Sequence, residues 1–138
     1  MGNLRRIFYV SRADASLDGV TVKNIVLKAQ RTNRQMDVTG VLAHSGRHFA
    51  QVLEGAEDKL AVLTAKIKQD KRHTDVTVLF DDPISRRDYG DWSMGFLYDA
   101  NLCDEIEKAL SDSTHQSHDR DGALARKIFL HISDLARP

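Results

Sequence analysis

The sequence predicts an α+β fold in a single domain. Two observations support this prediction: strand-like apolar runs recur over residues 4–98, and two segments between them carry apolar residues at helical spacing. The chain has 138 residues, of which 41% are hydrophobic and 29% charged, a composition typical of one folded domain. We therefore expect one core domain, residues 1–98, followed by a C-terminal extension, residues 99–138.

The first two expected elements are a strand over residues 4–11 and a helix over residues 21–33. In the strand, Tyr9 alternates with Phe8 and Val10, so the phenol points to the side opposite these two apolar side chains. In the helix, apolar residues recur at the spacing that produces one buried face, namely Val22, Ile25, Val26 and Ala29.

A hairpin and a second helix follow. Two strand-like runs, residues 38–44 and 48–54, are joined by Ser45, Gly46 and Arg47, a short glycine-containing connection that favours a hairpin. Residues 57–71 have acidic residues in the first turn and basic residues in the last, as a helix dipole favours. The apolar residues at helical spacing in this segment are Leu60, Leu63 and Ile67.

Two more strands, residues 75–80 and 92–98, complete the order βαββαββ, with the charged segment 82–90 as a long turn. This order is that of a ferredoxin-like fold, in which two helices cover one face of a mainly antiparallel sheet, because each helix buries its apolar stripe against strands. We expect the first strand to neighbour the second strand of the hairpin. The other sheet face is then left open.

The C-terminal extension is predicted to be a pair of helices. A short helix is expected over residues 102–110, and residues 111–121 carry no apolar side chain and should form a linker. A second helix is indicated by the spacing of Leu124, Ile128, Ile132 and Leu135. The two helices either cover the open sheet face or make a dimer contact.

Composition argues against several classes of function. Twenty Lys and Arg balance twenty Asp and Glu, so we expect no nucleic-acid partner. A single cysteine, Cys103, permits no internal disulfide, and no run of 18 apolar residues indicates a membrane span, so we expect a cytoplasmic protein. His44 and His48 flank an expected exposed turn without a carboxylate or cysteine to complete a metal site, so we expect no metal.

Polar side chains occupy several core-facing positions. Gln51 lies on the same side of its strand as Phe49, and Tyr9 faces the same way from the neighbouring strand. Buried polar groups need partners, so Tyr9 and Gln51 either fix the core through mutual or backbone hydrogen bonds or form a ligand site. Asn33, at the expected end of the first helix, is either its C-terminal cap or a ligand contact.

Trp92 and Met94 share one side of the last expected strand, where they either fill space or contact a ligand. His115 and His118 fall in the expected linker and should be solvated. Glycine-rich nucleotide motifs, the nucleophile-elbow motif and the HExxH metal motif are absent from the sequence. These motifs therefore give no support for a nucleotide-binding, hydrolase or metalloprotease function.

Four sequence segments resemble the BLUF domain, a blue-light sensor that uses FAD, over residues 4–98. They are RRIFYVSRA, IVLKAQRTNRQMDVTGVLAHSGRHFAQVLEG, DKRHTDV and DWSMGF. The most specific features are VTGVL followed by FAQVLEG at hairpin distance, a tyrosine in the upstream strand and W-S-M downstream. The resemblance implies a short, stand-alone photoreceptor with no enzymatic reaction, carrying FAD, or FMN or riboflavin in recombinant material.

The resemblance also implies photochemical roles for four residues. Tyr9 matches the tyrosine that gives an electron and a proton to the photoexcited flavin, and Gln51 matches the glutamine between it and the flavin N5 and C4 carbonyl edge. An amide both donates and accepts, so rotation or tautomerisation of Gln51 changes the hydrogen bond to that carbonyl and shifts absorption to the red. Trp92 and Met94 match the pair that relays the change through the last strand to the tail helices.

Further flavin contacts are implied in the same way. Asn33 matches an asparagine that hydrogen-bonds the polar edge of the ring, and Lys66 lies where relatives often carry a basic residue. Ile25 and Ile67 would hold the ring between the two helices. Thr32 departs from the Asn or His that is common in relatives, and we expect it to tune affinity or recovery rate without abolishing binding.

The expected output is a signal to a separate effector protein, with a cyclic-dinucleotide enzyme or a transcription regulator as candidates, from a homodimer. The main alternative is a non-photoactive flavin-binding redox or interaction domain. An acylphosphatase-type enzyme is disfavoured because residues 11–15 lack glycine and carry an acid where an anion-binding loop is needed. An RNA-binding module is disfavoured by the zero net charge and by Phe8 and Phe49, which lie outside the RNA-binding aromatic pattern.

Overall fold

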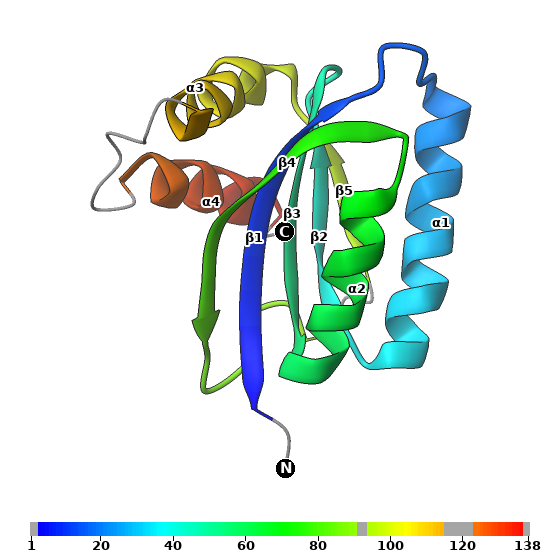
Figure 1. The fold of residues 1–138 in the computed structure, drawn as a ribbon, viewed down its shortest axis with the longest axis vertical. Coiled ribbons are helices and arrows are strands. Elements are labelled where there is room, and N and C mark those ends of the chain that lie inside the picture. The colour runs from blue at the N-terminus through cyan, green and yellow to red at the C-terminus, as the bar shows by residue number, and fades with distance from the viewer. Residues whose placement is uncertain (1–2, 91–93, 115–122, 137–138) are drawn as a thin grey trace.

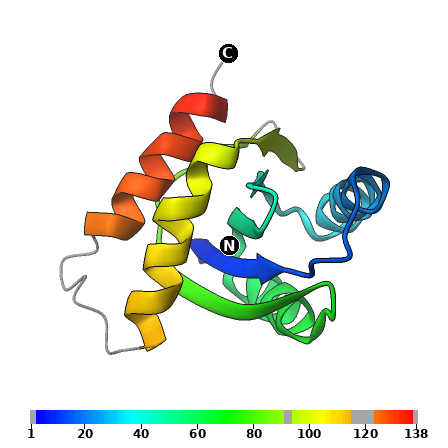
Figure 2. The ribbon, with the colours of Figure 1, turned by 90° about the horizontal axis from the view of Figure 1, so that it is seen from above.

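The computed structural model describes residues 3–90, 94–114 and 123–136. It is a three-layer arrangement in which a five-stranded sheet has helices on both faces, as Figures 1 and 2 show. The strands are β1 Leu4–Ala13, β2 Thr39–His44, β3 His48–Ala56, β4 His73–Pro83 and β5 Gly95–Tyr98. The helices are α1 Gly19–Met36, α2 Glu57–Gln69, the 3-10 turn η1 Ala100–Leu102, α3 Cys103–Thr114 and α4 Ala123–Ala136. The predicted α+β, ferredoxin-like order is confirmed.

The sheet has the order β4-β1-β3-β2-β5, and β1 pairs with β3 as predicted. Every pairing is antiparallel except that of β2 with β5. Gly40 allows β2 to approach β3 closely, because a Cβ atom built there would lie 1.9 Å from the carbonyl oxygen of Val52. The VTGVL segment therefore needs its glycine for strand packing.

Each sheet face has its own hydrophobic core, because side chains alternate along the strands. Helices α1 and α2 cover one face, and α3 and α4 cover the other (Figure 2). The C-terminal helices thus cover the sheet face that α1 and α2 leave free, as predicted. The core under α1 and α2 includes Ile7, Val22, Val26, Leu53 and Leu60, and the core under α3 and α4 includes Phe8, Val10, Ile106, Ile128 and Ile132.

Helix α1 begins at the cap residue Asp18, whose carboxylate accepts from the Thr21 amide at 2.8 Å. The helix ends one turn later than predicted. Asp37, with a left-handed backbone at φ 54°, is the C-terminal cap, and its amide points to the carbonyls of Asn33 and Arg34. The interpretation of Asn33 as the cap is therefore wrong; Asn33 lies within α1 and is buried.

Several predicted boundaries were wrong. Strand β4 continues through Pro83, into the expected turn, because its outer residues pair with β1. Strand β5 begins at Gly95, so Met94 precedes it, while Trp92 lies outside the described residues. Helix α3 extends through Thr114 into the expected linker. His115 and His118 also lie outside the described residues.

His48 corrects another expectation. Its side chain is buried rather than exposed at a hairpin turn, because α3 packs over it and Glu107 binds its ring. Within the residues that the structure describes, no group of three or more His, Cys, Asp or Glu could hold a metal ion. Over the same residues, no helix combines the length and the hydropathy that a membrane crossing requires.

Candidate functional site

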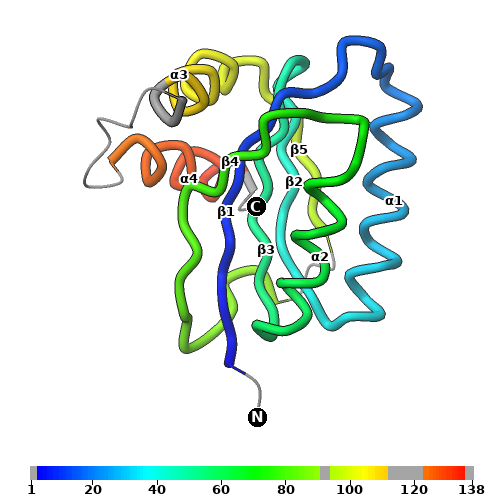
Figure 3. Tube along the Cα trace, viewed as in Figure 1, coloured from blue at the N-terminus to red at the C-terminus, as the bar shows by residue number. Residues whose placement is uncertain are grey.

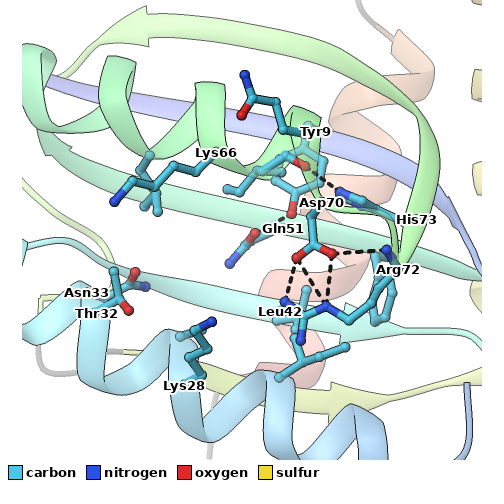
Figure 4. Close-up of a pocket in the computed structure, with 16 residues that line it drawn as sticks. Tyr9, Lys28, Thr32, Asn33, Leu42, Gln51, Lys66, Asp70, Arg72 and His73 are labelled. Carbon is cyan, nitrogen blue, oxygen red and sulfur yellow. Dashed lines mark hydrogen bonds and ion pairs between the residues drawn. The ribbon is translucent and has the colours of Figure 1, made fainter.

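A cavity of about 350 Å³ lies between α1, α2 and the sheet face that these helices cover (Figure 4). Its walls combine aliphatic side chains with a few amides, hydroxyls and charged groups, which is typical of a small-molecule site. The lining residues from α1 are Ile25, Lys28, Ala29, Thr32 and Asn33. Those from the sheet and α2 are Tyr9, Leu42, Phe49, Gln51, Leu63, Lys66, Ile67 and Gln69, followed by Asp70, Arg72 and His73.

Tyr9 and Gln51 form the floor of the cavity. They are directly opposite each other in the β1–β3 register, and the Tyr9 hydroxyl donates to Gln51 Oε1. Gln51 Nε2 donates to the Met94 sulfur at 3.4 Å, and a thioether is a weak acceptor. The two residues therefore hydrogen-bond each other, as expected if they fix the core. They also line a cavity, as expected if they form a ligand site.

The Tyr9 phenol is held in its protonated form. Burial is the main cause that raises the pKa of Tyr9 far above its ordinary value, and the negative charge of Asp70 adds to the shift. Tyr9 is 4% exposed and Gln51 6% exposed, so the bond between them is almost fully shielded from solvent. Loss of the Tyr9 proton alone is therefore costly. It is less costly when the phenol loses an electron at the same time.

Two aliphatic side chains flank the cavity from opposite helices. Ile25 projects from α1 and Ile67 from α2, and both are partly buried. Asn33 and Thr32 reach the cavity from the last turns of α1, whereas Lys28 and Lys66 are exposed residues that line it (Figure 4). The cavity wall thus combines apolar side chains from both helices with the buried amide of Asn33 and two exposed lysines.

Sequence reasoning did not assign the segment that closes the cavity after α2. The Asp70 carboxylate accepts from Arg72 through Nε at 2.9 Å, Nη2 at 2.5 Å and the backbone amide at 3.0 Å. The side-chain bond to Arg72 is the main cause that lowers the pKa of Asp70 to about 2. In the sequence, only the resemblance draws attention to the DKRH segment, because charges after a helix usually indicate solvent exposure.

His73 completes that wall in a defined orientation. Its Nε2 lies 2.6 Å from the Ile67 carbonyl oxygen, which can only accept, so Nε2 carries a proton. In the neutral ring, Nδ1 then accepts from the Ser11 hydroxyl at 2.8 Å. The ring meets Tyr9 edge-on, with the two ring centroids 6.2 Å apart. His73 thus ties the start of β4 to α2 and to β1 beside Tyr9.

The predicted site residues largely converge. Tyr9, Ile25 and Thr32 line the cavity, and so do Asn33, Gln51, Lys66 and Ile67. Met94 is not in the lining; it lies behind Gln51, buried, and contacts its amide. Trp92 cannot be placed because it lies outside the described residues.

Comparison with known proteins identifies the family. The family model for BLUF, sensors of blue-light using FAD, matches residues 4–95. This chain belongs to the BLUF family. FAD is the chromophore of that family, and the cavity, with its aliphatic sides and amide-bearing end, has the chemistry to hold a flat heteroaromatic ring.

Known relatives include photoreceptors with different outputs. The chain is 36% identical over 92 residues to photoactivated adenylate cyclase subunit beta of Euglena gracilis, covering 66% of this chain and 11% of that protein. It is 37% identical over 93 residues to the blue light- and temperature-regulated antirepressor BluF of Escherichia coli strain K12, covering 66% and 23%. The chain therefore spans only a small part of these relatives.

Solved structures agree with the fold. The BLUF protein BlrB in its dark state has a TM-score of 0.69 and 27% identity, and the match covers 94% of this chain and 96% of that one. Klebsiella pneumoniae BlrP1 with FMN and cyclic diGMP has a TM-score of 0.66 and 32% identity, covering 76% and 30%. The match to BlrB extends over most of the C-terminal helices as well as the core.

Proposed function

We propose that this chain is a flavin-binding blue-light photoreceptor in which Tyr9 and Gln51 are the residues that respond to excitation. The observation that carries the proposal is the buried Tyr9–Gln51 hydrogen bond in the wall of a cavity between α1, α2 and the sheet, in a chain of the BLUF family. Tyrosine is an oxidisable donor, and an amide offers both a donor and an acceptor to a ligand edge.

The residues present fit a flavin. Ile25 and Ile67 would pack on the two faces of the ring, and Asn33 and Gln51 would hydrogen-bond its polar edge. Thr32 offers a hydroxyl near Asn33, a shorter reach than the side chains common in relatives. The cations at the cavity, Lys28, Lys66 and Arg72, suit the phosphates of FAD or FMN. The cavity volume of about 350 Å³ lies within the range of small-molecule sites.

When bound, the flavin absorbs blue light and accepts an electron. Tyr9 would supply that electron together with its phenolic proton, both passing to the bound flavin, because the raised pKa of the phenol argues against loss of the proton alone. Gln51 Oε1 accepts the hydrogen bond from the Tyr9 hydroxyl, so it is the first atom that the proton would reach. The Tyr9–Gln51 bond thus couples electron loss at Tyr9 to a change at Gln51.

Gln51 has a second arrangement within reach. Its Nε2 contacts only the weak acceptor Met94 among the bonds described, so little is lost when the amide turns or tautomerises. Either change replaces the group that Gln51 presents to the cavity. With a flavin bound, a new hydrogen bond from Gln51 to its carbonyl would shift the absorption to the red, because the site is shielded from water.

The output would leave the core through Met94, β5 and the C-terminal helices. We propose that the chain acts as a sensor, without a reaction of its own, that signals to an effector. The named functions of relatives make a cyclic-dinucleotide enzyme or a transcription regulator the two candidate effectors. The dimeric state and the cytoplasmic location stay predictions.

The test is the visible absorption spectrum of the purified protein before and after blue light, followed in the dark. We expect a flavin spectrum with a red shift that reverses, and no such shift in Tyr9→Phe or Gln51→Leu. Tyr89→Phe is the matched control, because it removes a buried phenol that bonds Ser133, away from the cavity. A colourless protein, or a flavin that bleaches without the shift, would instead favour the redox or interaction domain.

A further inference from the structure

We propose that Glu107 of α3 is the latch through which a change at the Tyr9–Gln51 pair reaches the C-terminal helices. This inference rests on the proposed function and adds a second route for its signal, beside the one through Met94 and β5. Glu107 Oε1 accepts from Arg12 on β1 at 2.5 Å, and Glu107 Oε2 lies 2.6 Å from His48 Nε2 on β3. One carboxylate of α3 therefore binds both β1 and β3, the strands that carry Tyr9 and Gln51.

The strand register connects the latch to the site. Arg12 and His48 are opposite each other across β1 and β3, as are Tyr9 and Gln51. Arg12 lies three residues along β1 from Tyr9, and His48 lies three residues along β3 from Gln51. Because an odd offset reverses the side-chain direction, the same two strands present Tyr9 and Gln51 to the cavity and Arg12 and His48 to α3. A shift between these strands therefore acts on both sheet faces.

A second connection runs through β4. His73 lines the cavity and bonds Ser11, the residue before Arg12. Two residues after His73, the Asp75 carboxylate accepts from the other terminal nitrogen of Arg12 at 2.6 Å. Arg12 is thus held between β4, whose first residue His73 lines the cavity, and Glu107 of α3. Displacement of His73 or of β1 moves the donor that Glu107 binds.

The orientation of His48 is fixed by its surroundings. His48 is buried, its Nδ1 lies 3.1 Å from the Ser45 hydroxyl, and its Nε2 donates to the Glu107 carboxylate, which accepts only. One turn earlier on α3, Cys103 donates to the Ser45 carbonyl at 3.3 Å. The β2–β3 hairpin therefore meets the first half of α3, and Figure 3 shows them side by side.

The ion pair between Glu107 and Arg12 is weak enough to break and re-form. The hydrogen bond from Arg12 is the main cause that lowers the pKa of Glu107, and the bond to His48 adds to it. The carboxylate is therefore charged at neutral pH. Its side chain is nevertheless 47% exposed, and Arg12 is 33% exposed, so water and salt screen the pair. A weak pair is released by a small strand movement, whereas the apolar contacts of Ile106 keep α3 on the sheet.

The experiment compares Glu107→Gln with the wild-type holoprotein by two readouts: the flavin absorption shift under blue light, and amide hydrogen exchange of residues 103–111 in dark and light. In the wild type we expect light to speed exchange in α3. In Glu107→Gln the absorption shift should persist, while dark exchange in α3 rises about fivefold and its light dependence disappears. Lys108→Gln, which removes an exposed charge from the middle of the same helix, should behave as the wild type.

Arg12→Gln provides an independent second variant, since it breaks the latch from β1 without altering α3. It should reproduce the loss of light-dependent exchange. Unchanged light-dependent exchange in both Glu107→Gln and Arg12→Gln overturns the latch while leaving photoreception intact. An absent absorption shift in the wild-type protein overturns the photoreceptor proposal itself, so the two failures are distinguishable.

Discussion

The two faces of the sheet use alternate residues of the same strands for opposite purposes. On β1, Phe8 and Val10 are fully buried under α3 and α4, where Phe8 packs against Phe80 with ring centroids 5.3 Å apart. Between them, Tyr9 faces a cavity and pairs with Gln51. One face is a dry, close-packed core and the other exposes polar groups to a space. Stability and chemistry are thus separated by one residue along the chain.

The largest loss of stability should come from removing a side chain of the core under α3 and α4. Phe8→Ala removes a side chain with 0% exposure that contacts Phe80 and Phe129, so it should lower the free energy of unfolding by about 3–5 kcal/mol. Urea unfolding followed by circular dichroism measures the change. Leu130→Ala, at a position that is 52% exposed on α4, should change it by less than about 0.5 kcal/mol. Similar losses in the two variants would remove the basis for the contrast.

The dry face also contains a buried charge. The Glu54 carboxylate, with 0% exposure, accepts from Arg6 Nε at 2.8 Å and from the backbone amides of Asp88 and Tyr89 at 3.1 and 2.8 Å. Glu54→Gln keeps the shape but replaces an acceptor by a donor, so we expect a loss of about 2–3 kcal/mol. Amide exchange of residues 84–90 should rise with it, and a stable variant with an unchanged loop would contradict this account.

The cavity face should respond in a different pattern. Tyr9→Phe and Gln51→Leu each leave a polar partner unpaired and should cost about 1–2 kcal/mol. The double variant removes both partners at once, so its cost should be less than the sum of the two, at about 0–1 kcal/mol. A double-mutant cycle by urea unfolding measures this coupling. Strict additivity would mean that the bond between the two side chains contributes nothing.

The residues that sequence reasoning placed correctly share a local cause. Alternation along β1 and β3 was enough to direct Tyr9 and Gln51 to one side, and helical spacing was enough for Ile25 and Ile67. The failures depend on contacts distant in sequence. His48 is buried because Glu107, 59 residues later, meets it.

Local signals also misled where two structures satisfy them. Asn33 is a good helix cap, but Asp37 adopts the left-handed backbone instead and the helix continues to Met36. Polar residues such as 111–114 occur in linkers and in helices alike, and here the backbone is helical through Thr114. The Asp70–Arg72 pair could not be distinguished from ordinary surface charge until the fold placed it beside the cavity.

The smallest effect concerns that pair and depends on pH. Because the pKa of Asp70 is lowered from 3.8 to about 2 in the folded chain, its contribution to stability is present above pH 4 and is lost as pH falls toward 2. The side chains of Asp70 and Arg72 are 30% and 39% exposed, and screening reduces the contribution to about 1 kcal/mol. Asp70→Asn should therefore be less stable than the wild type at pH 6, and equally stable near pH 2. Urea unfolding of both proteins across this range measures the difference, and a difference that stays constant with pH would show that the carboxylate charge is not what holds Arg72 at the cavity.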